Sequence, residues 1–290
     1  MLNKKISDIV KPISHELKVF ERLLKGMVKY DNALLNPDLI NFLFSNQKRL
    51  RPIFVFLFSK ILNIKDTKTV QKIALALELI HSASLIHDDI IDETQIRRNQ
   101  ETFHNKFNTK IAVLLGDLLL SKALTVLSKT NSEIIEIFSK KIKDTILGEI
   151  EQNLNLYRVT SENEYIKKTY SKTGNLFMAG LEALFTLQEI NSDIKENLKI
   201  FLINYSIAFQ INNDIKDIKH DEENGNYTLV MLYFLMENSI DEFNEISIDK
   251  YVLMAKEKKN IYKKFAIEFL NTVENTVYKK SFLDLCDLTL

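Results

Sequence analysis

The sequence predicts an all-α fold in a single domain, and this prediction rests on two observations. Glycine and proline are scarce, with 6 Gly and 3 Pro in 290 residues, and every proline lies in the first fifth of the chain. The rest of the chain therefore lacks the turn residues that many short strands require. Apolar residues also recur at steps of three and four in one segment after another, which is the helical period. We expect one helical domain over residues 1–290.

The most regular helical pattern covers residues 68–92, where Val70, Ile73, Leu77 and Ile80 keep the three- and four-residue step. A polar stretch follows, and after it comes a segment that is apolar nearly all round, as helices are when they lie in a core or at a subunit interface. No repeat or low-complexity tract interrupts the chain. The segments expected after residue 92 are a loop at 94–109, helices at 110–128, 133–157, 162–187, 194–218 and 227–238, and two smaller helices in the charged tail at 239–290.

Composition excludes several classes of protein. The 39 basic and 39 acidic residues balance, which argues against a generic nucleic-acid binder, since such proteins carry a basic excess. A single cysteine, Cys286, excludes an internal disulfide framework and a cysteine-based zinc site. The N-terminus lacks an apolar signal core, so a cytoplasmic location is expected. No stretch comes close to the roughly 20 apolar residues of a membrane span, although an apolar product can partition into a membrane.

The strongest local pattern is Asp88-Asp89-Ile90-Ile91-Asp92. In a helix, positions i and i+4 share a face and i+1 lies close beside them, so we expect the three carboxylates to converge. Like charges at that spacing repel unless a cation lies among them, and ligation by oxygen alone suits Mg²⁺. The alternative is a solvated acidic turn, but the two isoleucines and the apolar helix before them favour a lined cavity.

A second cluster repeats this geometry far along the chain, with Asn213, Asp214 and Asp217 at i, i+1 and i+4. It ends an apolar helix, as the first cluster does. Two such clusters on different helices could face each other and hold Mg²⁺ around a diphosphate, because Mg²⁺ commonly binds through one or two carboxylates together with phosphate oxygens.

A diphosphate also requires fixed cations. Arg matches phosphate with a planar fork, and Lys acts as a point charge. Taken singly, each basic group is more often part of a solvated surface, but together, with Arg97 five residues after Asp92, they favour the other half of an ion-binding site. The candidates are Lys48-Arg49-Leu50-Arg51, Arg97-Arg98 and Lys172.

Histidines offer a different class of enzyme as an alternative. His81 and the His87-Asp88 pair suggest an HD-type metal phosphohydrolase, which uses imidazole ligands from several helices. His15, His104 and His220 lie in polar segments without a matching pattern. For His81 and His87 a hydrogen-bonded histidine at the edge of the core is an equally good interpretation.

Taken in order, these motifs resemble the trans-prenyl diphosphate synthases over about residues 45–230. The order and spacing of the motifs are more specific than any one of them. The matching segments are KRLRP at 48–52, HSASLIHDDIID at 81–92, RR at 97–98, GD at 116–117, GEIEQ at 148–152, KTG at 172–174 and FQINNDIKD at 209–217.

The resemblance implies antiparallel helices around a deep central cavity, usually in a homodimer, with isopentenyl diphosphate and an allylic diphosphate as substrates and about two or three Mg²⁺ per site. It also implies a role for each matching residue. Asp88, Asp89 and Asp92 match the first metal-binding motif, and Asp214 and Asp217 match the second, with Asn213 in its first position. Arg97 and Lys172 match contacts to the allylic diphosphate, Lys48, Arg51, His81 and Arg98 match the isopentenyl diphosphate site, and Thr173 and Gln210 match polar groups near the developing carbocation.

Product length is expected to depend on the residues one helical turn, about 5.4 Å, below Asp88. These are Ser84 and Ala83. In the resembled family, large aromatic residues there give short products, so the small residues predict a product longer than farnesyl. Leu120 and Leu124 are candidates for the floor of the tunnel.

Several positions depart from the pattern of the family. Asn213 replaces an aspartate, and Asn226 stands where a Gly-Lys pair usually supplies a lysine, for which Lys219 is a possible substitute. Asn99 and Glu101 replace the usual Gly and Pro. These departures keep open a non-catalytic or regulatory subunit of a heteromeric synthase, although such a subunit would be expected to lose the first aspartate motif.

Overall fold

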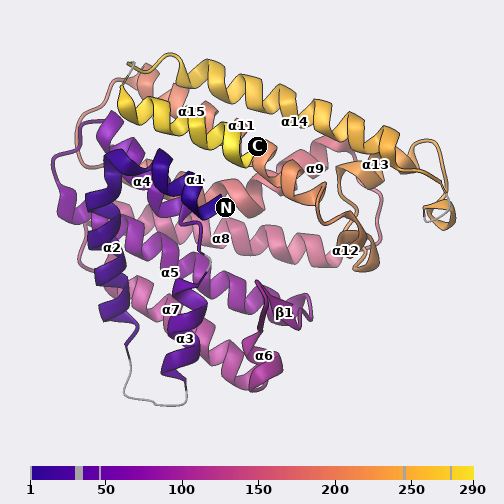
Figure 1. Ribbon diagram of the computed structural model, residues 1–290, viewed down its shortest axis with the longest axis horizontal. Coiled ribbons are helices and arrows are strands. Elements are labelled where there is room, and N and C mark those ends of the chain that lie inside the picture. The colour runs from indigo at the N-terminus through magenta and orange to yellow at the C-terminus, as the bar shows by residue number, and fades with distance from the viewer. Residues whose placement is uncertain (1, 30–34, 46, 244–245, 275) are drawn as a thin grey trace. The chain divides into compact units, whose positions relative to one another are not determined.

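The computed structural model of the chain describes residues 2–29, 35–45, 47–243, 246–274 and 276–290. Helices make up most of it (Figure 1), so the all-α prediction is confirmed. The chain folds into two compact units, one comprising Met1–Ile137 and Gly180–Glu189 and the other Phe138–Ala179 and Ile190–Leu290. The chain passes between the units three times, and the single-domain assignment stays a prediction.

The first unit contains helices from the N-terminal half and a short hairpin. Its elements are α1 (Leu2–Ile9), η1 (Lys11–Ile13), α2 (Ser14–Met27), α3 (Asn36–Phe44), α4 (Leu50–Ile61), α5 (Thr67–Ile91), β1 (Ile96–Arg97), β2 (Gln100–Glu101), α6 (Phe103–Lys106), α7 (Thr109–Leu127), the start of α8 (Ser132–Leu154) and the end of α10 (Asn175–Phe185).

Helix α5 lies at the centre of the first unit, packed against α4 and α7. Helix α4 contributes three buried aromatic residues, Phe54, Phe56 and Phe58. At one point α5 and α7 approach closely, because a Cβ on Gly116 would stand 2.1 Å from the Nε2 of His87. The absent side chain of Gly116 therefore leaves room for the His87 ring, one residue before the first aspartate cluster.

In the part of the chain that the structure describes, α5 is the one helix long and apolar enough to cross a membrane by length and composition. Its apolar residues have a different explanation, since 72% of its most apolar window is buried inside the protein. Core helices of soluble proteins pass the same test.

Side-chain caps fix where the long helices of the first unit begin. The Asp66 carboxylate accepts a hydrogen bond from the Thr69 N–H at the start of α5, at 3.0 Å, and this bond holds the pKa of Asp66 below its usual value. Asn108 accepts in the same way from the Ile111 N–H at the start of α7, at 2.9 Å. Each cap contributes on the order of 1 kcal/mol. Because α5 starts at a fixed residue, the position of its final turn, with Asp88 and Asp89, is fixed as well.

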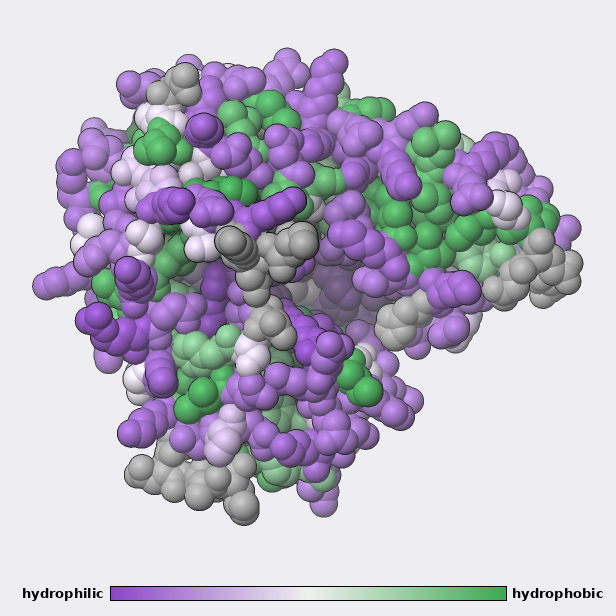
Figure 2. Space-filling model, viewed as in Figure 1, coloured by the Kyte–Doolittle hydropathy of each residue, from purple (hydrophilic) through white to green (hydrophobic). Residues whose placement is uncertain are grey.

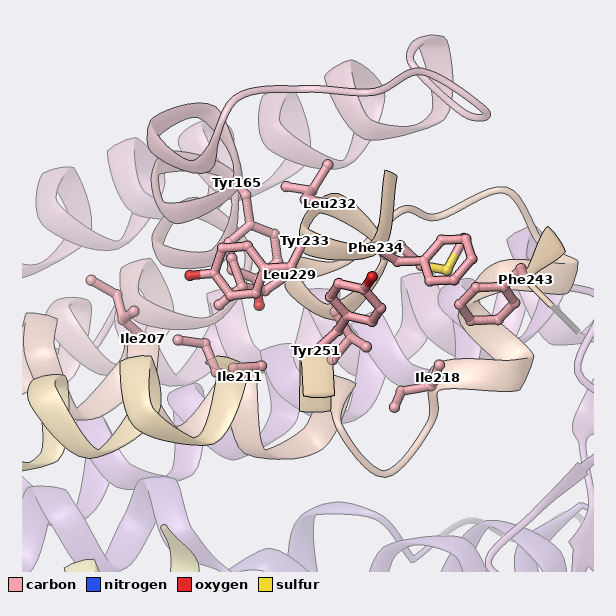
Figure 3. Packing of buried hydrophobic residues seen from close by; sticks show 13 residues of the cluster. Tyr165, Ile207, Ile211, Ile218, Leu229, Leu232, Tyr233, Phe234, Phe243 and Tyr251 are labelled. Carbon is pink, nitrogen blue, oxygen red and sulfur yellow. The ribbon is translucent and has the colours of Figure 1, made fainter. Parts of the chain in front are cut away.

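The second unit is organised around α11 (Ser192–Asp214), which runs beside α14 (Asp249–Leu270) in Figure 1. The cluster of buried residues in Figure 3 joins α11, α13 and α14, and in it the ring of Phe234 meets Phe243 and Tyr251 edge to face at 5.1 and 5.3 Å. The other elements are the rest of α8, α9 (Glu162–Thr169), η2 (Tyr170–Gly174), the start of α10, α12 (Ile218–Glu223), α13 (Leu229–Leu235), η3 (Ile240–Glu242) and α15 (Val277–Thr289).

Hydrophilic residues dominate the face in Figure 2, with hydrophobic patches among them. Two helices carry several exposed large apolar residues. These are Val113, Leu114 and Leu124 on α7 and Ile135, Ile146, Leu147, Ile150 and Leu154 on α8. The apolar segment expected at 110–128 is thus not buried all round within this chain.

The structure differs from the expected elements in three places. The stretch 162–187 is not one helix, because a π-helical turn interrupts it at Tyr170–Gly174. The expected loop at 94–109 contains a hairpin and the short helix α6. The tail holds two helices as expected, but α14 has 22 residues and is not small.

Candidate active site

The first aspartate cluster lies at the C-terminal end of α5. Asp89 is 2% exposed, Asp88 is half-buried, and Asp92 is exposed and ends the helix, its N–H bonded to the carbonyl of Asp88 at 2.8 Å. The Arg97 Nε donates to Asp89 Oδ1 at 2.5 Å. Burial raises the pKa of Asp89, and the opposing attraction of Arg97 is the next largest influence.

A two-residue hairpin brings Arg97 to Asp89. Strands β1 and β2 pair antiparallel, and the residues between them, Arg98 and Asn99, both have left-handed backbone angles, with φ of 52° and 63°. Tight hairpin turns require this conformation at both positions, and Asn adopts it more readily than most residues. This explains how the chain keeps its turn with Asn99 in place of the expected glycine.

Four arginines gather around His81, although they come from two separate segments. Burial lowers the pKa of His81 well below its usual value, and Arg51, Arg98, Arg97 and Arg49 lower it further. His81 is therefore neutral at physiological pH. Such a concentration of positive charge in one unit is suited to an anion.

Arg49 serves the fold rather than the anion site. Its guanidinium is buried and donates to Glu78 at 2.6 Å, to Glu21 at 2.7 Å and to the Leu43 carbonyl at 2.6 Å. The sequence analysis grouped Arg49 with its neighbours as a candidate phosphate contact. Its place between two carboxylates corrects that grouping. Of its neighbours, Lys48 is exposed and Arg51 is half-buried.

The second aspartate cluster, in the other unit, contains a chain of hydrogen bonds. The Thr173 hydroxyl donates to Gln210 Oε1 at 2.7 Å, the Gln210 amide donates to Asp214 Oδ1 at 2.6 Å, and the Tyr165 hydroxyl donates to Asp214 Oδ2 at 2.5 Å. Asp214 is buried, and its burial raises its pKa, while the two hydrogen bonds oppose that shift. Asp214 is thus held in one orientation by two neutral side chains.

The π-helical turn η2 sets the position of Thr173 and Lys172. Such turns insert an extra residue into a helix and occur often at functional sites. A Cβ on Gly174 would stand 2.3 Å from the Tyr170 ring, so any other residue at the end of this turn would require that ring to move. Lys172 pairs with Glu149 at 3.0 Å.

A pocket of about 120 Å³ opens beside Asp214. Burial raises the pKa of Asp221 to about 7, and the charge of Asp214 adds to that rise. Asn213 is half-buried and Asp217 is exposed. The residues that line the pocket are Gln152, Tyr165, Lys168, Thr169, Lys172, Gln210, Asp214, Asp217, Asp221, Asn226 and Thr228.

Among the described residues, no three His, Cys, Asp or Glu side chains lie close enough together to hold a metal ion. The Asp89 carboxylate is turned to Arg97, and the expected convergence of Asp88, Asp89 and Asp92 stays a prediction. The roles of these residues as magnesium ligands stay predictions.

The donor chemistry of both clusters nevertheless fits Mg²⁺. This ion needs only one or two carboxylates when water and phosphate oxygens complete its shell. Burial is the largest cause of the raised pKa of Asp221, and the charges of Asp214 and Asp217 add to it; a divalent cation would relieve that repulsion.

The HD-type phosphohydrolase alternative depends on His87 as a metal ligand, and the contacts of this histidine have another explanation. The Nε2 of His87 lies 3.3 Å from the Val113 carbonyl and 3.5 Å from Asp117 on α7. His87 is therefore explained by its packing against α7. The His220 side chain lies outside the described residues.

The residues expected to set product length have mixed outcomes. Ala83 is buried, and Ser84 donates from its hydroxyl to the His81 carbonyl at 2.9 Å. Leu120 is half-buried. Leu124 is 54% exposed, so its assignment to the floor of a tunnel within this chain is wrong.

Sequence reasoning missed three residues of the second cluster. Tyr165 and Lys168 precede the KTG motif by seven and four residues and reach the site through the fold, and no sequence signal marks them. Asp221 follows Asp217 by four residues, one helical turn, and that spacing could have identified it.

The fold defines the class of protein. The chain is similar to the solved structure of heptaprenyl diphosphate synthase from Staphylococcus aureus, with a TM-score of 0.86 and 24% identity over 95% of this chain and 96% of that one. It therefore has the all-α isoprenoid synthase fold.

Sequence comparison gives the family. A sequence profile described as polyprenyl synthetase matches residues 35–230. A prenyl transferase of Cyanophora paradoxa is 33% identical over 81% of this chain and 77% of its own length. Solanesyl diphosphate synthase 1, chloroplastic, of Arabidopsis thaliana is 34% identical over 73% of this chain and 54% of its own length. The chain belongs to the polyprenyl synthetase family and is a prenyltransferase, and the regulatory-subunit alternative is not favoured.

Proposed function

We propose that this chain is a magnesium-dependent enzyme that joins an allylic diphosphate head to tail with isopentenyl diphosphate. One observation carries the proposal: a single pocket combines three carboxylates, Asp214, Asp217 and Asp221, with the ammonium groups of Lys168 and Lys172. A metal-bound polyanion requires both kinds of group, carboxylates for the metal and ammonium groups for the remaining charge. A site for an uncharged ligand requires neither.

The reaction breaks the bond between the allylic carbon and the diphosphate oxygen. The π electrons of isopentenyl diphosphate form the new carbon–carbon bond, and a proton then leaves to the departing diphosphate, which makes a chain five carbons longer. Asp89, Asp214 and Asp217 would hold about two or three Mg²⁺, which spread the charge of the leaving diphosphate. Lys172 and Arg97 are proposed to bind diphosphate oxygens directly.

Thr173 and Gln210 are proposed to face the developing allylic cation. Their hydrogen bonds run in one direction, from the Thr173 hydroxyl to Gln210 and from the Gln210 amide to Asp214. This fixes the rotamer of Gln210 before substrate binds, so its carbonyl dipole needs no reorganisation during the reaction. Lys48, Arg51, His81 and Arg98 are proposed to bind isopentenyl diphosphate.

A product longer than farnesyl is part of the proposal. Ala83 and Ser84 are small, and the names of two similar proteins, solanesyl and heptaprenyl diphosphate synthase, denote long chains. We also propose a homodimer, supported by the exposed Val113 and Leu114 of α7. Sedimentation velocity tests it, since a monomeric mass at micromolar concentration contradicts it.

The proposal is tested by replacing one carboxylate of each cluster with its amide. Asp89→Asn and Asp214→Asn keep the shape of the side chain but remove its charge, so elongation should fall by at least about a hundredfold if each holds a metal. The control is Asp287→Asn, on an exposed carboxylate that pairs with Lys263. Elongation is measured with Mg²⁺, farnesyl diphosphate and isopentenyl diphosphate. Rates within twofold of the parent in either cluster variant contradict its role.

A further inference from the structure

The pocket beside Asp214 contains a second lysine that no sequence motif marks. Lys168 lies on α9, four residues before Lys172, and both lysines line this pocket. The Lys168 Nζ donates to Asn226 Oδ1 at 2.7 Å, and the Asn226 amide donates to Asp221 Oδ1 at 3.0 Å. Lys168 is thus held in place by the loop after α12 and lines the pocket with the three carboxylates.

The surroundings of Lys168 disfavour the charged form of its side chain. Burial lowers its pKa, and the positive charge of Lys172 lowers it further, against the attraction of Asp214, Glu149 and Asp221. Two cations in one half-buried pocket repel each other, and a polyanion between them removes that repulsion. The bond to Asn226 is to a neutral acceptor and engages one of the three N–H donors of an ammonium group. Asn226 therefore orients Lys168 without neutralising it.

We infer that Lys168 binds the diphosphate group of the allylic substrate and supplies the cation expected at position 226. The resemblance places a lysine at that position, and Asn226 occupies it here. Lys219, the substitute considered from the sequence, is exposed and is not among the residues that line the pocket. In this chain the cation stands on α9, and Asn226 in the loop positions it through their hydrogen bond. This inference rests on the proposed function, because it names a substrate contact of the same site.

The test uses inorganic pyrophosphate with Mg²⁺ as the probe and isothermal titration calorimetry as the readout. In Lys168→Met the dissociation constant should rise roughly ten- to hundredfold, the usual effect of removing a hydrogen bond to a charged group. Lys167→Met is the matched control, since Lys167 is the adjacent lysine of the same helix, is exposed, and lines a neighbouring pocket instead. Its dissociation constant should stay within twofold of the parent.

A variant that moves the lysine to the loop tests the inference more strictly. The double variant Lys168→Met/Asn226→Lys returns a cation to the loop and should regain at least tenfold of the lost affinity. In elongation assays Lys168→Met should raise the KM for the allylic diphosphate more than it lowers kcat, with the KM for isopentenyl diphosphate within twofold. A structural defect would not separate the two substrates. Lys168→Gln, which can still bond to Asn226, replaces the methionine variant if the latter does not fold.

The inference is overturned if folded Lys168→Met binds pyrophosphate as tightly as the parent protein does. It is also overturned if Lys167→Met loses as much affinity as Lys168→Met. Failure of the proposed function gives a different result. If the parent protein elongates no substrate but the Lys168→Met variant binds pyrophosphate more weakly, the proposed reaction is refuted and the contact of Lys168 with phosphate is retained. If the parent protein elongates its substrate and the Lys168→Met variant binds pyrophosphate with unchanged affinity, only the contact of Lys168 with phosphate is refuted.

Discussion

Replacing Arg49 with methionine should destabilise the protein strongly, because it leaves a buried carboxylate without its main partner. The Arg49 and Glu78 side chains are 7% and 4% exposed and their charged atoms lie 2.6 Å apart. Removal of one member of such a buried pair costs about 3–5 kcal/mol. Methionine still fills the space between Phe20 and Phe44, whose ring centres lie 5.6 and 5.3 Å from the guanidinium carbon. The loss of stability in Arg49→Met is therefore due more to the unpaired charge of Glu78 than to a cavity.

Two further variants isolate the cause. Arg49→Met/Glu78→Leu removes both charges and should recover most of the lost stability, since apolar residues often replace a buried pair at little cost. Lys250→Met breaks an ion pair with Glu237 at the same 2.6 Å, with side chains 60% and 49% exposed, and should leave the unfolding midpoint nearly unchanged. The assay is urea unfolding followed by far-ultraviolet circular dichroism. A similar loss in Arg49→Met and Lys250→Met, or no recovery in the double variant, refutes the reasoning.

Three more predictions follow from single residues. Ala83→Tyr should shorten the products, seen by chromatography of the chain-length distribution, and an unchanged distribution contradicts the tunnel argument. Gly225→Ala should lower the melting temperature, because φ is 69° there and a Cβ would stand 2.6 Å from the Tyr157 ring. Adding Tyr157→Ala should recover part of the loss. An unaltered melting temperature in Gly225→Ala alone counts against the contact. Cys286 is buried and burial raises its pKa to about 12, so its thiol should resist Ellman's reagent until the protein unfolds, and fast labelling of native protein would show that α15 is not packed as described.

The long helices were predictable because their apolar residues are periodic and their ends carry caps. Helix α5 starts and ends within one residue of the expected 68–92 and α7 within one residue of 110–128. The π-helical turn at Tyr170–Gly174 was not, because one extra residue in a turn barely disturbs the apolar pattern around it. The hairpin at 96–101 also escaped, because its turn residues Arg98 and Asn99 include no glycine.

The candidate site was predictable where charges cluster along the sequence and not where the fold assembles them. Asp89 and Asp214 stand in recognisable motifs. The Tyr165 hydroxyl reaches Asp214 from 49 residues away, and Asn226 positions Lys168 from 58 residues away, so neither contact leaves a local pattern. The contact between Arg97 and Asp89 depends on the hairpin turn at Arg98 and Asn99, so it could not be predicted from helical spacing either.

The central claim is that this chain elongates an allylic diphosphate, and the most direct measurement is a reaction of the purified chain alone with Mg²⁺, farnesyl diphosphate and radiolabelled isopentenyl diphosphate. The account predicts labelled products longer than farnesyl, formed only when Mg²⁺ is present. Folded protein that yields no labelled product at saturating substrate, or yields one only after a second kind of subunit is added, would contradict it.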